Sequence, residues 1–281
     1  MLRVMNTLIS VFNTHEKPFR YLLAQLLVKA GLNKRKIIHR SNGYKIHFSD
    51  AAVARILYAY KDERIEEEAL LTRILQPGNV YVDVGANIGT LALTASLAVG
   101  ENGNVIAIEA HPLTFKYLES NIKLNGFSNI ELIHSAVGDS EGELIFSDQN
   151  SDDQNRILID RETGIRVPVE TLDKILKGEM EIHLLKIDVE GYEKFVLDGA
   201  EETLKRTTAV LFESWDDHFA YYGYDFKTIF DYLNGCGFRV FKLEGEILQR
   251  VNSDYRSLNC ENLLALRFPD QFVEKFGFEM R

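Results

Sequence analysis

The chain has 281 residues, of which 46% are hydrophobic, enough for one substantial core with an appendage. Its two cysteines, Cys236 and Cys260, are too few for a disulfide framework and lack the paired spacing of a zinc site. The formal net charge is −10, but residues 1–40 hold eight Lys or Arg against one acidic residue, so the acidic remainder argues against nucleic acid as a partner.

The basic N-terminal segment contains a predicted amphipathic helix that ends near Gly31. The preceding stretch VMNTLISVF is too short and too polar to span a membrane, and no signal-peptide cleavage site follows it. We therefore expect a cytoplasmic protein with a helical extension over residues 1–60. Three roles stay open for the helix: it covers a core, forms a subunit contact, or lies peripherally on an anionic membrane. Its leucines recur at helical spacing, at Leu22, Leu23, Leu26 and Leu27.

From residue 63 onward, helical and strand patterns alternate, and we expect residues 61–281 to form one domain. Strands that alternate with helices at this spacing imply right-handed crossovers and a doubly wound, mostly parallel sheet of the α/β class. The sequence predicts helices over 63–76, 89–99 and 112–126 and strands over 80–84, 104–110 and 129–139.

The alternation breaks near residues 140–170, where two strand patterns flank a polar loop and predict a strand insertion. A short helix with Thr171 as its N-cap then restarts the cycle. After it, the sequence predicts strands over 182–191, 208–214, 238–243 and 262–268 and helices over 192–206 and 226–237.

The segment VDVGANIG, residues 82–89, marks a candidate ligand site. In an open parallel sheet, ligands bind outside the carboxyl ends of the strands, where Asp83 and the glycine turn lie. Glycines let a ligand approach the backbone closely, and the next helix presents free N–H groups to an anionic group. Glu109 ends the next strand, where a carboxylate can accept hydrogen bonds from both ribose hydroxyls. Since the G-x-G-x-x-G spacing is missing, a nucleoside with a small charged tail fits better than a dinucleotide.

These motifs carry a family resemblance. VDVGANIG followed by IAIEAHP resembles the S-adenosylmethionine site of class I methyltransferases, which have a Rossmann-like fold. LLKIDVEGYEKFVLDGAEETL, with SAVGD and VPVETLDKIL, looks like the FkbM family of methyltransferases over about residues 70–215. That family acts mostly on hydroxyls of sugars and natural products, so the resemblance implies S-adenosylmethionine as cofactor and a small molecule or glycan as acceptor. It places Asp83, Gly85, Asn87 and Gly89 at the methionine end of the cofactor, Glu109 at its ribose, and Ser135 and Ala136 at its adenine.

Candidate catalytic groups lie at two further predicted strand ends: Asp188 and Glu190 end one strand and Glu213 the next, so their carboxylates should face one cleft. Methyl transfer to an oxygen requires positioning and a base that takes the hydroxyl proton. Asp188, which also belongs to the expected cofactor site, and Glu213 are candidates for this base, with His218 in the aromatic segment SWDDHFAYYGYD as a third. Asp188 and Glu213 could instead hold Mg²⁺, and the sequence leaves this alternative open.

Two other functional classes are compatible with the same fold. A nucleotide-dependent oxidoreductase would share the sheet, although its glycine signature is missing here. A non-catalytic scaffold that binds the cofactor without turnover finds its best support in the basic N-terminal helix.

Overall fold

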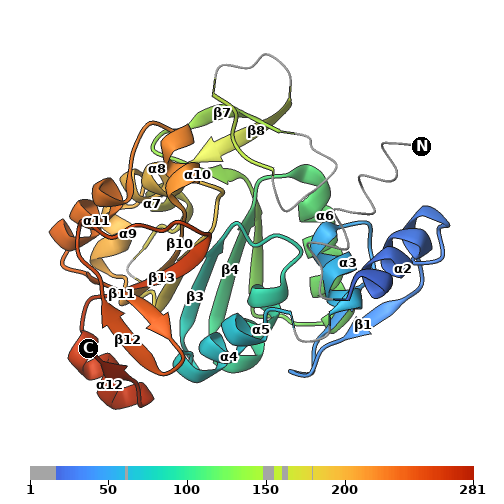
Figure 1. The fold of residues 1–281 in the computed structure, drawn as a ribbon, viewed down its shortest axis with the longest axis horizontal. Helices are drawn as coiled ribbons and strands as arrows, with labels where there is room; N and C mark the ends of the chain where they lie inside the picture. Colours follow the sequence, from blue (N-terminus) through green and yellow to red (C-terminus); the bar gives the residue numbers. More distant parts are fainter. Residues whose placement is uncertain (1–16, 61–62, 148–154, 160–163, 179) are drawn as a thin grey trace.

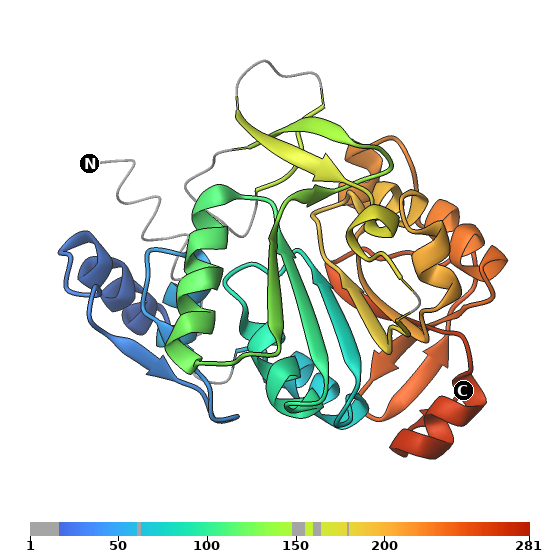
Figure 2. The same ribbon diagram turned by 180° about the vertical axis from the view of Figure 1, so that it is seen from behind.

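A central sheet with helices on both faces organises the chain in this computed structural model, which describes residues 17–60, 63–147, 155–159, 164–178 and 180–281 (Figures 1 and 2). Within the described residues the central sheet has nine strands: β3 Val80–Val84, β4 Asn104–Glu109, β5 Ile130–His134, β9 Leu184–Ile187, β10 Ala209–Ser214, β11 Arg239–Glu244, β12 Ile247–Arg250, β13 Glu261–Leu266 and β14 Glu279–Met280.

The order of these strands across the sheet is β5-β4-β3-β9-β10-β13-β11-β12-β14. The five strands from β5 to β10 run parallel, as the alternating pattern predicts. β13 lies between β10 and β11 and is antiparallel to both. Because the chain order reverses between β3 and β9, the carboxyl ends of these two strands border the crevice where doubly wound sheets bind ligands.

Two hydrophobic clusters cover the two faces of this sheet. On β3, the side chain of Tyr81 packs into one cluster, whereas Val80, Val82 and Val84 pack into the other. The described helices that follow the extension are α4 Ile65–Ile74, α5 Thr90–Val99, α6 Pro112–Asn125, α7 Leu172–Ile175, α8 Glu193–Asp198, α9 Glu201–Lys205, α10 Asp216–Tyr221, α11 Phe226–Gly235 and α12 Pro269–Phe276.

The predicted strand insertion is confirmed as a second sheet. β6 Ala136–Val137, β7 Gly142–Phe146 and β8 Ile165–Glu170 form three strands in the order β6-β8-β7. Most of the polar loop between β7 and β8 lies outside the described residues. This sheet lies beyond the carboxyl ends of β3 and β4 and covers them (Figure 1). Thr171 caps α7 as predicted, since its Oγ1 accepts a hydrogen bond from the Lys174 amide at 3.2 Å.

One predicted helix differs. The pattern over 192–206 predicts a continuous helix, but the structure has α8 and α9 with a break at Gly199. The break lies where the chain passes close to the segment between β6 and β7. A Cβ at Gly199 would lie 2.0 Å from the carbonyl oxygen of Gly138, so this position requires glycine. Gly138 is far away in sequence, and the helical pattern contains no sign of this contact.

The N-terminal extension contains more than the predicted helix. It comprises α2 Pro18–Lys29, a hairpin of β1 Ile37–His39 and β2 Lys45–His47, and α3 Ala52–Ala59. Ile46 and Leu57 belong to the same hydrophobic cluster as Leu93 of α5, so the extension packs on the main core.

The division of the chain into an extension over residues 1–60 and a domain over residues 61–281 stays a prediction. None of the described helices is long and apolar enough to cross a membrane.

Candidate functional site

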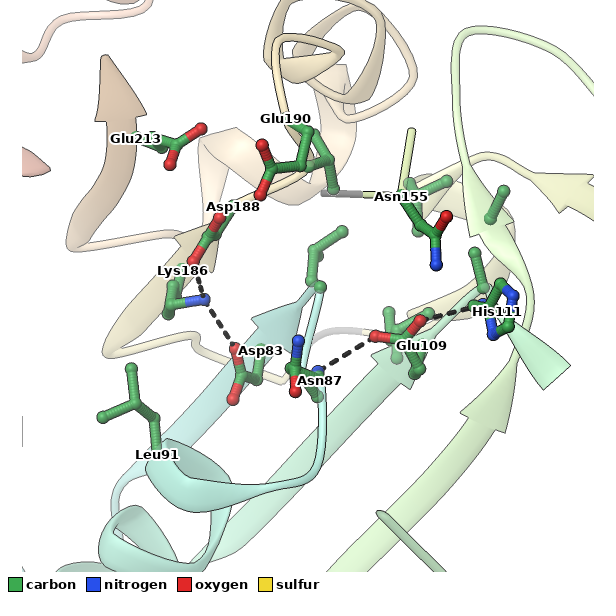
Figure 3. Close-up of a pocket in the computed structure, with 18 of the residues that line it drawn as sticks. Asp83, Asn87, Leu91, Glu109, His111, Asn155, Lys186, Asp188, Glu190 and Glu213 are labelled. Atoms are coloured by element: carbon green, nitrogen blue, oxygen red, sulfur yellow. Dashed lines mark hydrogen bonds and ion pairs between the residues drawn. The ribbon is translucent and has the colours of Figure 1, made fainter. Parts of the chain in front are cut away.

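A pocket opens at the carboxyl ends of β3, β4, β9 and β10, beneath the second sheet (Figure 3). It brings together most of the residues that the sequence marks. Gly89 and His218 are not part of its lining. The predicted site residues that do line it are Asp83, Gly85, Asn87, Glu109, Ser135, Ala136, Asp188 and Glu213.

The turn after β3 shapes one wall of the pocket. Gly85 has a φ of 83°, and a Cβ there would lie 1.8 Å from the carbonyl oxygen of Asp188. Gly89 has a φ of 91°, and its Cβ would lie 2.6 Å from Cδ1 of Leu118 in α6. In the structure both glycines therefore permit close approach between parts of the protein: the turn against the end of β9, and α5 against α6.

Glu109 stands at the end of β4 with its carboxylate facing the pocket. Its Oε2 accepts a hydrogen bond from the Asn87 amide at 2.9 Å, and its Oε1 accepts one from the His111 amide at 2.8 Å. Burial raises the pKa of Glu109 to about 7, although the two amide donors act in the opposite direction. A carboxylate oxygen can accept two hydrogen bonds, and each oxygen of Glu109 accepts one here, so the group can accept hydrogen bonds from two further donors.

Lys186 was not among the predicted site residues, yet it links two of them. Its ammonium lies 3.3 Å from Asp83 Oδ1 and 3.1 Å from Asp188 Oδ2, and all three side chains meet at the end of the parallel strands (Figure 3). Burial opposes the charge on Asp188, but Lys186 and Arg64 outweigh it and hold its pKa below the ordinary value. Asp188 is therefore charged, paired and a weak base.

A second group of polar side chains lies at the ends of β9 and β10. His218 Nδ1 lies 3.4 Å from Oε2 of Glu213 and 3.6 Å from Oε2 of Glu190. The thiol of Cys260 donates to Oε1 of Glu213 at 2.8 Å, and the Trp215 ring packs 4.2 Å from the His218 ring. His218 thus contacts the pocket wall through Glu190 and Glu213, although it does not line the pocket itself.

The aromatic segment 215–224 lies behind this wall. Phe219 and Tyr222 are buried, and Tyr222 donates to the carbonyl of Ile157 at 2.8 Å. Tyr224 donates to the carbonyl of Gly191 at 2.6 Å. Since none of the five aromatic residues of this segment lines the pocket, their contacts support the loops around it.

Glu190, which was expected to face the cleft from its strand end, and Arg64, which was not predicted as a site residue, also line the pocket. Among the described residues other than glycine, three have a left-handed backbone: Arg64, Asn87 and Glu190, with φ of 59°, 51° and 56°. All three line this pocket, and residues held in such conformations concentrate at functional sites. Glu190 belongs to the segment KIDVEG, residues 186–191, at the end of β9. Arg64 precedes an ordinary helix, and no sequence signal marks it.

The turn that carries Glu190 is held by a buried carboxyl group. Glu193 Oε1 accepts hydrogen bonds from the amides of Val189 at 3.1 Å and Gly191 at 3.3 Å. Burial, together with the charge of Glu213, raises the pKa of Glu193 to about 8. The pocket wall also contains the apolar side chains of Ile108, Val137, Phe146 and Ile157.

Comparison with known proteins gives three kinds of similarity. A model of the methyltransferase FkbM domain matches residues 83–240. The hexuronic acid methyltransferase AglP of Haloferax volcanii is 28% identical over 192 residues, which cover 67% of this chain and 78% of that protein. The tRNA (guanine(37)-N(1))-methyltransferase Trm5b of Pyrococcus abyssi is 32% identical over 121 residues, 43% of this chain and 33% of that one. The crystal structure of methyltransferase FkbM from Methylobacillus flagellatus aligns with a TM-score of 0.45 and 14% identity over 76% of this chain and 54% of that chain.

Proposed function

The chain belongs to the FkbM family of S-adenosylmethionine-dependent methyltransferases, and from this premise we propose that it methylates a hydroxyl group of a sugar, a glycan or a natural product. The similarity to a hexuronic acid methyltransferase supports a sugar-containing acceptor. The observation that supports transfer to oxygen is the contact between Glu213, which lines the pocket, and His218 behind it, because a hydroxyl acceptor must lose a proton as it is methylated.

The pocket fits S-adenosylmethionine in its chemistry from end to end. Glu109 has spare acceptor capacity for the two ribose hydroxyls, and the apolar wall near Ser135 and Ala136 suits adenine. The Asp83, Gly85 and Asn87 turn borders the opposite end, where Asp188 adds negative charge suited to the cofactor's ammonium and sulfonium groups. Gly89 then acts indirectly, by letting α5 start against α6.

When bound, the cofactor supplies a methyl group that passes to the acceptor oxygen while the carbon–sulfur bond breaks and its electron pair stays on sulfur. Among the catalytic candidates, Glu213 with His218 beside it is the best placed to take the hydroxyl proton. Glu213 lines the pocket, and its Oε2 lies 3.4 Å from His218 Nδ1, which can stabilise the carboxylate or pass the proton on. Asp188 is the second candidate, although its pairing with Lys186 favours a role in holding the cofactor.

A divalent cation is the alternative to a base at this place. Glu190, Glu213 and His218 each offer one ligand atom, and these atoms lie within 4.8 Å of one another. The predicted pair for Mg²⁺ was Asp188 and Glu213, but Asp188 faces Lys186, and a set with an imidazole nitrogen suits transition metals better than Mg²⁺. We expect methyl transfer to survive treatment with EDTA. A loss of activity that a divalent cation restores would instead favour the metal.

Labelled S-adenosylmethionine tests the proposed acceptor. The enzyme is incubated with the methyl-labelled cofactor and with neutral oligosaccharides, uronic-acid oligosaccharides or total RNA as separate acceptors. We expect alkali-stable label in a saccharide, because a methyl ether resists the alkali that hydrolyses a methyl ester. We propose no nucleic-acid acceptor, on the acidity of residues 41–281, so label in RNA would contradict both this proposal and the charge argument.

A further inference from the structure

Arg64 lines the pocket at the end of β3 and β9, together with Asp83, Lys186 and Asp188, and the charges of Asp83 and Asp188 act on its guanidinium. Arg64 lies outside the matched domain, which begins at residue 83, and directly precedes α4. Its backbone φ of 59° costs conformational free energy in residues other than glycine, so neighbouring contacts must stabilise it.

A buried polar network holds this turn. Arg40 Nη2 donates to the carbonyl of Glu63 at 2.6 Å and to Oε1 of Glu68 at 2.8 Å. Tyr44 donates to the same Glu68 oxygen at 2.5 Å, and the Glu68 amide donates to the carbonyl of Arg64 at 2.9 Å. The N-terminal extension therefore holds the residues on both sides of Arg64: Arg40 hydrogen-bonds to Glu63 and Glu68, and Tyr44 hydrogen-bonds to Glu68.

The charges around Arg64 leave its guanidinium available. Lys186 is already shared between Asp83 and Asp188. In the described part of the chain, the Arg64 guanidinium forms no hydrogen bond or ion pair, although the carboxylates of Glu67, Asp188, Glu63 and Asp83 act on its charge from further away. Among the described residues, the pocket therefore contains one cation in ion pairs, Lys186, and one whose guanidinium has no hydrogen bond or ion pair, Arg64.

We propose that Arg64 binds the carboxylate of the amino-acid end of S-adenosylmethionine. The guanidinium is a planar fork of donors that matches a carboxylate, and a charged arginine that lines a pocket and has no ion pair with the described residues is suited to an anionic ligand. The neighbouring Asp83 and Asp188 place negative charge beside it, so this end of the pocket complements both the ammonium and the carboxylate of one amino acid. The inference rests on the proposed function, because it assumes that the pocket holds this cofactor.

Calorimetric titration with three ligands tests the assignment. S-adenosylmethionine and S-adenosylhomocysteine carry the amino-acid end, and 5′-methylthioadenosine lacks it. Arg64→Gln should weaken binding of the first two by about tenfold or more and leave binding of the third unchanged. Arg64→Gly removes the guanidinium but suits the left-handed backbone, so it should show the same selective loss in a stably folded protein. Arg256→Gln, which removes an exposed charge outside the pocket, is the matched control and should bind all three ligands like the wild type.

The outcomes are distinct. Equal losses for all three ligands, or no loss for any in a folded Arg64→Gly variant, would overturn the assignment. An unchanged cofactor affinity with weaker use of uronic-acid acceptors would also overturn it and give the carboxylate to the acceptor instead. If the wild type binds neither S-adenosylmethionine nor 5′-methylthioadenosine, the proposed function fails before Arg64 is tested.

Discussion

At the scale of single residues, the site depends on how burial and neighbouring charge divide its carboxylates. Glu109 and Asp188 both face the same pocket, but they differ in their partners. Burial raises the pKa of Glu109 to about 7, against the opposing effect of its two amide donors. Asp188 lies beside Lys186 and Arg64, so its pKa is lowered. The two carboxylates are therefore suited to different tasks.

The raised pKa of Glu109 predicts pH-dependent cofactor binding. In the proposed binding mode, the ionised carboxylate accepts the ribose hydrogen bonds, so affinity for S-adenosylmethionine should rise as the pH increases through about 7. Folding has the opposite dependence: since the folded pKa exceeds the unfolded value, the stability contributed by this group is complete at low pH and is lost as the pH rises through about 7. Calorimetry across this range checks the first trend, and urea denaturation checks the second.

Glu109→Gln supplies the control for both trends. The variant keeps the size of the side chain but cannot ionise, so its affinity should be lower by about tenfold at high pH and nearly independent of pH. A variant that retains the full pH dependence would show that another group titrates.

The catalytic candidates separate in a pair of substitutions. Glu213→Gln should lower turnover by about 10²- to 10⁴-fold with little change in cofactor affinity, because it removes the proposed proton acceptor. Asp188→Asn leaves Lys186 with one carboxylate fewer, so it should weaken S-adenosylmethionine binding as well as turnover. Steady-state kinetics and calorimetry on both variants check this. The reverse pattern, with Asp188→Asn affecting turnover alone, would make Asp188 the base.

At the scale of secondary-structure elements, the alternating core could be predicted and its connections to distant segments could not. Between β3 and β10, hydrophobic residues recur at the spacing typical of a strand or of a helix within each short segment, so each element could be predicted locally. α6 begins at Pro112 and ends before Gly126, as its sequence predicts. The strands of the β1–β2 hairpin are only three residues long, too short to show a period. The site residues divide in the same way. Asp83 and Glu109 end recognisable strands and could be predicted, whereas Arg64 lies beside Glu63, whose carbonyl accepts a hydrogen bond from Arg40 of the extension, and no local pattern marks it.

The buried Arg40–Glu68 pair, which joins the extension to α4, predicts a large effect on stability. Both side chains are 1% exposed, so Arg40→Met leaves a buried carboxylate with fewer donors and should lower the free energy of unfolding by about 3 to 5 kcal/mol. Arg166→Met breaks an exposed pair with Glu143 and should change it by less than about 1 kcal/mol. Urea denaturation measures both. Equal stability of the two variants would mean that Tyr44 and Asn42 satisfy Glu68 without Arg40.

At the scale of the whole molecule, charge and exposed apolar surface are unevenly distributed. α2 leaves Leu23 and Leu26 exposed by 49% and 63%, while Ala24 on its other side is buried in the core. The predicted helix is confirmed, and its apolar residues face both the protein and the solvent. The basic residues around it would complement an anionic surface. The membrane and subunit roles of this helix stay predictions.

Leu23→Glu with Leu26→Glu tests that surface without disturbing the core. Because both side chains are exposed, the thermal midpoint should change little, whereas sedimentation with anionic vesicles should fall relative to the wild type. Light scattering on the same samples reports the molecular mass. A lower mass with unchanged vesicle binding would assign the helix to a subunit contact.

The position of β13 has a consequence for how the protein is made. This strand is among the last to leave the ribosome, yet it lies between β10 and β11 in the finished sheet. Until it emerges, β10 has an unpaired edge, which is a site where nascent chains can associate wrongly. The ends of β3, β4 and β9 that border the pocket are synthesised well before, whereas Cys260, whose thiol donates to Glu213, arrives with β13. During synthesis, the chain therefore completes the strand ends of the proposed cofactor site first and the thiol contact of the proposed proton acceptor last.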